Sequence, residues 1–257
     1  MKDRVILVTG ATSGIGRATA LLFAEIGAKV VATSRTPRAG TELVQEIRNA
    51  GGDAAFVPCD VTDAKQVQAA VTFAVDHFDR LDFAFNNAGI FLPESILHDH
   101  TEDIWDQVIA TNLSSIYHCM KAEIIAMHET TMNHNVDCVI VNNASIVGHR
   151  GSAASGLAYT TAKHGVIGLT RQVAVTYAGE RLRVNAVSPG PTLTNATSAG
   201  LDLPPDERRE KLLGLNPTGQ LVDVDEIAST VAFLCSDAAR MINGQDIALD
   251  GGQLAKL

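Results

Sequence analysis

The stretch Val5-Ile6-Leu7-Val8-Thr9-Gly10-Ala11-Thr12-Ser13-Gly14-Ile15-Gly16 decides the fold of this chain. Its first four residues form an aliphatic run that is typical of a parallel strand buried on both faces. Behind the glycines, Ala18, Leu22 and Ile26 recur at helical spacing, and Gly27 suits the end of that helix. Glycines let a backbone approach a pyrophosphate, and a helix N-terminus attracts its charge. Strand, glycine-rich turn and helix together therefore predict a dinucleotide site.

The rest of the chain continues this alternation of strands and helices without a repeat, a low-complexity linker or a domain break. We therefore predict one α/β domain over residues 1–257, a Rossmann fold whose doubly wound parallel β-sheet carries helices on both faces. Further strands are expected at Lys29–Thr33, Ala54–Pro58, Leu81–Asn86, Cys138–Asn142, Arg183–Val187 and Asp246–Leu249. Further helices are expected at Asp63–Phe78, Glu102–His128, Leu157–Ala178 and Val224–Cys235.

The end of the second strand indicates which nicotinamide cofactor the site takes. An acidic residue there would accept hydrogen bonds from a ribose 2′-hydroxyl, whereas a basic residue accommodates a 2′-phosphate. Ser34-Arg35-Thr36 occupies this place, Arg38 could add charge, and no acidic residue follows until Glu42. Since an arginine can bind a phosphate through two hydrogen bonds, the sequence favours NADP(H), with NAD(H) as the alternative.

Tyr159 and Lys163 stand four residues apart, and Ser145 stands fourteen residues before the tyrosine. On a helix, Tyr159 and Lys163 lie on the same face, one turn apart. An ammonium beside a phenol favours the phenolate, so we expect a lowered pKa for Tyr159. A phenol tuned in this way could exchange a proton with a substrate oxygen, which the Ser145 hydroxyl could hold. This trio predicts acid–base chemistry at a carbonyl or an alcohol.

Taken together with these residues, the chain resembles the short-chain dehydrogenase/reductase family from Lys2 to about Gly252. Asp60-Val61 is similar to the family's adenine-contacting pair, Asn86-Asn87-Ala88-Gly89 to the motif after its fourth strand, and Asp250-Gly251-Gly252 to its C-terminal signature. The resemblance implies a cofactor site made of Gly10, Thr12, Ser13, Gly14, Ile15, Gly16, Ser34, Arg35, Thr36, Asp60, Val61, Asn87, Ala88, Gly89, Tyr159, Lys163, Pro189, Gly190, Thr192 and Thr194.

The resemblance also implies a reaction, the reversible transfer of a hydride between NADP(H) and a ketone or secondary alcohol. Tyr159 is expected to be the general acid and base, and Ser145 to orient the substrate oxygen. Lys163 is expected to lower the tyrosine pKa and to bind the nicotinamide ribose, and Asn112 to hold a water linked to Lys163. A small-molecule substrate pocket is implied at Ser145, Val147, Leu157 and Tyr159, with Arg150 and His149 available for a polar group.

Residues 192–217 contain prolines, glycines and a charged run from Asp206 to Lys211, and we predict a substrate lid there. Enoyl reductases of the same superfamily carry the active-site lysine further along the helix, at a position that is Val166 here, so we set them aside. Two other classes remain as alternatives: a nucleotide-binding regulatory protein, and a scaffold subunit. Neither explains why the chain holds Ser145, Tyr159 and Lys163 together.

A net charge of −9 argues against nucleic acid or an anionic membrane as the main partner. The N-terminus leads directly into a strand, no apolar run reaches a membrane span, and the spacing of the four cysteines suggests free thiols, so we expect a cytoplasmic protein. The last residues, Ala255-Lys256-Leu257, are similar to a peroxisomal address. We expect no metal site, because Met132 stands where a second histidine would follow His128-Glu129. Homo-oligomers, tetramers or dimers, are expected from the family.

Overall fold

A computed structural model describes residues 1–93, 95–152, 155–194 and 204–256 of the chain. Its centre is a seven-stranded parallel sheet with the order β3-β2-β1-β4-β5-β6-β7. All seven predicted strands are present, so the predicted single-domain Rossmann architecture is confirmed. The strands are β1 (Val5–Thr9), β2 (Lys29–Ser34), β3 (Asp53–Pro58), β4 (Phe83–Asn86), β5 (Cys138–Asn143), β6 (Leu182–Pro189) and β7 (Asp246–Leu249).

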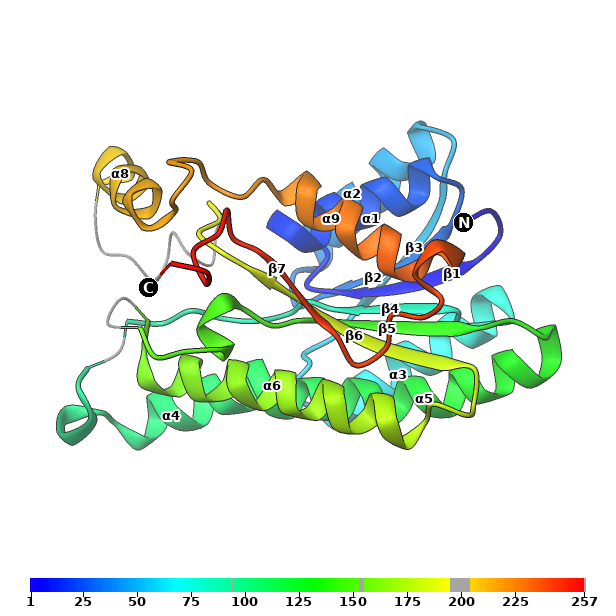
Figure 1. Ribbon diagram of the computed structural model, residues 1–257. Coiled ribbons are helices and arrows are strands. Elements are labelled where there is room, and N and C mark those ends of the chain that lie inside the picture. Colours follow the sequence, from blue (N-terminus) through cyan, green and yellow to red (C-terminus); the bar gives the residue numbers. More distant parts are fainter. Residues whose placement is uncertain (94, 153–154, 195–203, 257) are drawn as a thin grey trace.

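Helices cover both faces of this sheet, as Figure 1 shows. One layer consists of α1 (Gly14–Glu25), α2 (Pro37–Asn49) and α9 (Val224–Cys235). The other layer consists of α3 (Ala64–Phe78), α4 (Glu102–Ile109), α5 (Ser115–His134) and α6 (Leu157–Thr176). A further helix, α8 (Pro205–Leu215), lies apart from both layers, near the C-terminus of the chain. Short 3₁₀ turns occupy Leu97–Asp99, Ile146–Gly148 and Asp237–Ala239.

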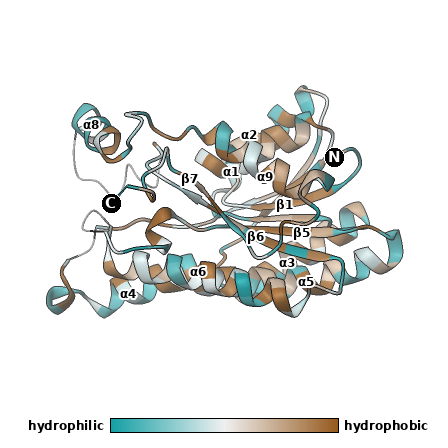
Figure 2. Ribbon diagram, in the orientation of Figure 1, coloured by the Kyte–Doolittle hydropathy of each residue, from teal (hydrophilic) through white to brown (hydrophobic). Residues whose placement is uncertain are grey.

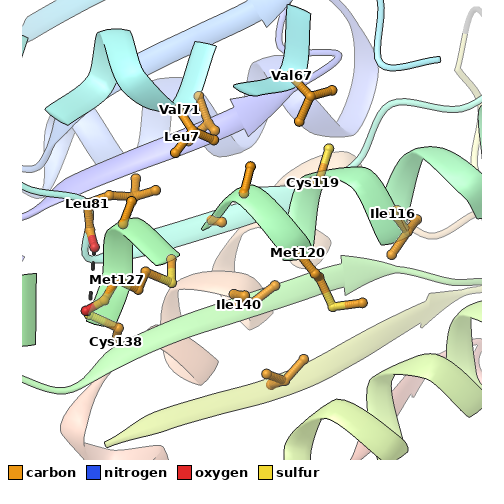
Figure 3. Close-up of a cluster of buried hydrophobic side chains, with 14 of the residues drawn as sticks. Leu7, Val67, Val71, Leu81, Ile116, Cys119, Met120, Met127, Cys138 and Ile140 are labelled. Carbon is orange, nitrogen blue, oxygen red and sulfur yellow. Dashed lines mark hydrogen bonds between the residues drawn. The ribbon is translucent and has the colours of Figure 1, made fainter. Parts of the chain in front are cut away.

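The core is divided by the sheet into two hydrophobic clusters, because successive side chains of a strand point to opposite faces. Ile6 and Val8 of β1 pack toward α1 and α9, whereas Leu7 packs toward α3 and α5. Figure 2 shows hydrophobic colour along the strands and hydrophilic colour concentrated on the outer helices. Figure 3 shows the cluster that contains Leu7: Val71 lies beside Leu7, and Met120 lies beside Ile140.

Local capping explains where several helices begin and end. The Asp63 carboxylate accepts a hydrogen bond from the Lys65 backbone N–H at 2.8 Å and so starts α3. Asp223 and Glu226 form a capping box at the start of α9. Asn135 ends α5 in the left-handed region, with φ of 54°.

The predicted helix Glu102–His128 proves to be two helices joined by a π-helical turn at Ala110–Ser114, and α5 continues to His134. In this turn the Asn112 side chain donates to the Val108 carbonyl at 3.0 Å, and Ser115 Oγ donates to the Thr111 carbonyl at 2.6 Å. Such side-chain bonds compete with the helix ladder, and π-turns inside helices are frequent at functional sites. Helices α2 and α8 were not predicted, and α8 lies within the predicted lid.

None of the helices in the described part of the chain is both long enough and apolar enough to span a membrane.

Candidate active site

A cavity of about 380 Å³ opens at the carboxyl ends of the strands. Parallel α/β sheets bind ligands at this edge, where the strand order reverses, and the reversal here lies between β1 and β4. Segments that follow β1, β2, β3, β4, β5 and β6 all contribute to the cavity wall. The fold therefore brings together motifs that are far apart in the sequence.

The glycine-rich turn after β1 leaves no room for a side chain at Gly10 or Gly16. Gly10 has φ of +64°, and a Cβ on it would lie 3.0 Å from the Ala88 Cα. A Cβ on Gly16 would lie 2.4 Å from the Gly10 carbonyl oxygen. Ser13 caps α1 without a side-chain hydrogen bond, so the first N–H groups of this helix face the cavity beside Gly14 and Ile15. These features fit a bound pyrophosphate.

The end of β2 places an unpaired cation at the cavity. Arg35 is exposed, lines the cavity, and makes no ion pair with any described residue. Arg38, by contrast, pairs with Glu42 at 2.9 Å and does not line the cavity. Asp60 stands nearby, and the Thr62 backbone hydrogen bond, helped by the Arg35 charge, lowers the pKa of its carboxyl. This corner could hold an adenosine with a phosphorylated ribose.

Two asparagines tie the ends of β1, β4 and β5 together. Asn87 Nδ2 donates to the Thr9 carbonyl at 3.0 Å, and the backbone N–H groups of Asn87 and Ala88 donate to Thr9 Oγ1 at 2.9 and 3.0 Å. Asn143 Nδ2 donates to Asn87 Oδ1 at 2.9 Å. Asn143 was not among the predicted site residues, although its place at the carboxyl end of β5, next to Asn142, was a signal that could have found it.

Tyr159, Lys163 and Ser145 meet at the cavity wall. Tyr159 and Lys163 stand one turn apart on α6, and the Lys163 Nζ lies 5.5 Å from the centroid of the Tyr159 ring. Ser145 caps the 3₁₀ turn Ile146–Gly148 and hydrogen-bonds to the Tyr159 phenol. The Phe91 ring packs edge-on against the Tyr159 ring at 5.0 Å.

The expected lowering of the Tyr159 pKa is wrong. Burial raises the pKa of Tyr159 to about 12, and the Ser145 hydrogen bond only partly opposes this. Lys163 donates to the Asn143 carbonyl at 2.6 Å, and burial lowers its own pKa to about 8. Desolvation of both groups outweighs their mutual attraction here, because each charged form leaves water for a dry wall.

Asn112, in the π-helical turn, is almost fully buried and lines the cavity. Its Oδ1 accepts the Ile90 backbone N–H at 3.1 Å, so it fixes the segment after β4. A Cβ on Gly89 would lie 2.7 Å from this oxygen, which explains the glycine. The predicted water between Asn112 and Lys163 stays a prediction.

The segment after β6 closes the cavity from the other side. A Cβ on Gly190 would lie 2.9 Å from the Asp250 Cα, so the segment packs tightly against the C-terminal signature. Thr192 Oγ1 donates to the Gly190 carbonyl at 3.0 Å, and Thr194 lies over Gly14. Residues 195–203 of the predicted lid lie outside the described residues.

Comparison with known proteins agrees with this geometry. A family model described as enoyl-(acyl carrier protein) reductase matches residues 10–253. The cis-4-hydroxycyclohexanecarboxylate dehydrogenase of Sinomonas cyclohexanicum is 40% identical over 253 residues, which cover 98% of this chain and 97% of that protein. A crystal structure of levodione reductase has a TM-score of 0.93 at 34% identity and covers 100% of both chains. A crystal structure of an actinorhodin polyketide ketoreductase with NADPH has a TM-score of 0.90 at 29% identity and covers 98% of both.

The chain belongs to the short-chain dehydrogenase/reductase family. It is an oxidoreductase of the alcohol dehydrogenase and ketone reductase type, and this family binds NAD(P)(H).

In this dehydrogenase, most of the predicted site residues line the one cavity. Two do not: Gly16 lies behind the glycine turn, where it permits close packing, and Leu157 is exposed outside the cavity. His149 does not line the cavity either. Its Nε2 hydrogen-bonds the carboxylate of Asp246 on β7.

Several cavity residues were missed by the sequence reasoning, chiefly those with no motif of their own. Cys59 and Thr111 line the cavity beside predicted residues, and Gln253 reaches it from the segment after β7. Lys211 reaches it from α8, within the predicted lid. The four cysteines are free, as predicted. Among the described residues, no three metal-ligating side chains cluster.

Proposed function

We propose that this dehydrogenase transfers a hydride reversibly between NADP(H) and a ketone or secondary alcohol, with Tyr159 as general acid and base. The observation that carries the proposal is the convergence of Tyr159, Ser145 and Lys163 on the same cavity as the glycine-rich turn. When bound, the nicotinamide supplies or accepts the hydride. The protein must then supply a proton and hold the substrate oxygen.

Tyr159 suits proton donation at neutral pH. Its raised pKa keeps the phenol protonated, so that it can protonate the alkoxide that develops during reduction. Ser145 hydrogen-bonds the same phenol and is placed to orient the substrate oxygen beside it. In the reverse direction Tyr159 must act as a phenolate, so alcohol oxidation should speed up as pH rises.

Lys163 is a buried cation within a turn of the tyrosine. Its ammonium donates to the Asn143 carbonyl, which holds it close to the Tyr159 ring and the cavity. We propose that its charge stabilises the phenolate in the alcohol-oxidising direction and that it also binds the nicotinamide ribose. Asn112 would hold the water that links this lysine to solvent.

The preference for NADP(H) rests on Arg35. Its guanidinium lines the cavity without an acidic partner among the described residues, and Ser34 and Thr36 flank it. The presence of NADPH in the related ketoreductase structure supports the same preference. NAD(H) remains the second candidate, with Arg35 then solvated.

The substrate class rests on the cavity and on the relatives. Ile90, Phe91 and Val147 give the wall an apolar character. The names of a hydroxycyclohexanecarboxylate dehydrogenase and of a cyclohexanol dehydrogenase among the relatives support a secondary alcohol on a ring. Val166, at the lysine position of enoyl reductases, is fully buried in the core, which favours carbonyl over enoyl chemistry.

We also propose that residues 192–217 act as a lid and that the enzyme is a homo-oligomer. Leu212 and Leu215 of α8 already line the cavity, which supports a covering role. Tyr117, Ile125 and Val175 leave apolar surface exposed on α5 and α6, which supports an interface there. Cofactor-dependent protection of the lid from proteolysis and light scattering in solution would test these two points.

The decisive experiment measures NADPH and NADH binding to the purified protein and then their oxidation by a panel of cyclic and linear ketones. We expect NADPH to bind more tightly, and Arg35→Ala to weaken NADPH about tenfold or more while it spares NADH. Equal loss for both cofactors would contradict the role of Arg35. Binding without turnover on any ketone would favour a nucleotide-sensing protein instead.

A further inference from the structure

Helix α8 presents one cation to the cavity. Of its charged residues whose side chains are described, Lys211 alone lines the cavity, whereas Asp206, Glu207, Arg209 and Glu210 do not. Leu212 and Leu215 line it with Lys211, as their helical spacing requires. The helix therefore offers an ammonium and two apolar side chains to whatever occupies the space beneath it.

This cation has no acidic counterpart at its end of the cavity. Lys211 makes no ion pair with any described residue. Asp60, the acidic residue among the described cavity walls, stands after β3 near Arg35 and is held there by Thr62. Lys211 is exposed, so water solvates its ammonium, and an anionic group on a ligand in the cavity can replace that water through a charge-assisted hydrogen bond.

A second polar group near the C-terminus has no partner. Gln253 lines the cavity, and its Oε1 is buried without a hydrogen-bond partner among the described residues. Buried amide groups normally bond to something, so a ligand group is expected here. The Gln253 Oε1 can accept a hydrogen bond from a ligand hydroxyl or N–H, and its Nε2 can donate to an anionic group.

The rest of the wall defines the body of that ligand. Phe91 packs edge-on against Tyr159, so the reacting carbon sits beside an aromatic ring. Val147, Leu212 and Leu215 add aliphatic surface. The same cavity must hold the nicotinamide cofactor as well, so only part of its wall is open to the substrate.

We propose that the substrate is a compact ketone or secondary alcohol that carries a carboxylate, which Lys211 binds and Gln253 supports. This inference rests on the proposed function, since it names the substrate of that same site. The ketone oxygen meets Ser145 and Tyr159, and the carboxylate lies under α8. Lys211 is then a specificity-determining residue with no part in the proton transfer.

The test compares 4-oxocyclohexanecarboxylate with its methyl ester as substrates of the full-length enzyme with NADPH. We expect the wild type to prefer the acid, and Lys211→Met to lower kcat/KM for the acid about tenfold, through KM, while the ester is unaffected. Arg209→Met, which removes a cation from the same helix outside the cavity, should leave both substrates unchanged. Added salt should weaken the preference for the acid in the wild type.

Several outcomes would overturn the inference. An equal loss for acid and ester would mean that Lys211 only positions α8, and a raised KM for NADPH would assign the ammonium to the cofactor. A larger effect on acetoacetyl-coenzyme A than on the acid would assign it to a phosphate. Turnover of other ketones without any preference for the acid would overturn this inference alone. Failure of every ketone would overturn the proposed function itself.

Discussion

Two polar networks lie one residue apart along the same two strands, and they differ in almost everything that matters for function. Asn87 and Asn143, at the ends of β4 and β5, bond each other beside the cavity, and Asn143 holds Lys163. Asn86 and Asn142, one residue earlier, bond each other at 3.1 Å inside the protein. The first pair faces the cofactor site, whereas the second is sealed between the sheet and its helices.

The sealed network ends on a buried acid. Asn86 Nδ2 donates to Glu123 Oε2 on α5 at 3.0 Å, and Asn142 Nδ2 donates to Thr170 Oγ1 on α6 at 2.9 Å. Asn86 Oδ1 and Glu123 Oε1 are both buried without a partner among the described residues. A proton on Glu123 Oε1 would donate to Asn86 Oδ1 and so satisfy both atoms, and burial raises the pKa of Glu123 to about 7.

The difference teaches that burial alone does not make an acid or a base functional. Lys163 and Glu123 are both buried, and burial favours the uncharged form of each. It lowers the pKa of Lys163 to about 8 and raises the pKa of Glu123 to about 7. Lys163 lines the cavity, where it can meet a ligand, whereas Glu123 does not. We therefore expect changes in the cavity network to alter catalysis and changes in the sealed network to alter stability.

The largest effect should follow a change in the cavity. Tyr159→Phe removes the proposed proton donor and should lower kcat about 1,000-fold, because no other described side chain beside Ser145 is placed to replace it. Calorimetry should show NADPH binding within about twofold of the wild type, since the ring remains. Tyr177→Phe, the same change at the other end of α6, is the matched control. If Tyr159→Phe kept a tenth of the activity, the assignment of Tyr159 as the proton donor would be wrong.

A second prediction concerns Lys163 and pH. We expect kcat/KM for ketone reduction to fall as pH rises through about 8, because Lys163 loses its proton and charge there. Lys163→Arg should move this fall to higher pH, because a guanidinium stays charged. Lys163→Met should lower the rate about 100-fold below pH 8 and remove the fall, because it lacks the charge at every pH. A profile that keeps its fall near pH 8 in Lys163→Arg would assign the titration to another group.

Substitutions in the sealed network should change the stability of the protein rather than its catalysis. Glu123→Ala leaves the Asn86 amide without its acceptor and opens a cavity, so we expect a loss of about 2–4 kcal/mol in the free energy of unfolding. Glu123→Gln keeps both hydrogen bonds with a neutral amide and should stay within about 1 kcal/mol of the wild type. Denaturant unfolding measures both, and kcat of the folded fraction should change less than about threefold.

The pH dependence of unfolding distinguishes the wild type from Glu123→Gln. The folded state holds the Glu123 proton more tightly than the unfolded chain, so its contribution is complete below about pH 4.5 and is lost as pH rises through about 7. The loss should be about 3 kcal/mol and absent in Glu123→Gln. Parallel curves for the two proteins would show that folding does not shift the pKa of Glu123, and the comparison of the two networks would then fail.

The features that the sequence predicted correctly depend on local interactions, whereas the features that it missed depend on side-chain contacts or on residues far apart in the chain. The strand Asp246–Leu249 and the helix Val224–Cys235 were predicted to the residue, since apolar periodicity and capping act within a few positions. The π-helical turn at Asn112 was missed, because it depends on side-chain bonds that no apolar pattern reveals. His149 was assigned to the pocket from its position after Ser145, but its partner Asp246 is 97 residues away.

The sequence by itself determined the Rossmann fold and the family, because these depend on short motifs in a fixed order, and it predicted most of the residues that line the cavity. Only the tertiary structure decided how those residues behave. It raised the Tyr159 pKa that the sequence alone had led us to expect lowered, gave Lys163 a carbonyl partner, and brought Lys211 to the cavity. The physical reason is that desolvation and hydrogen bonding depend on neighbours brought together from distant parts of the chain.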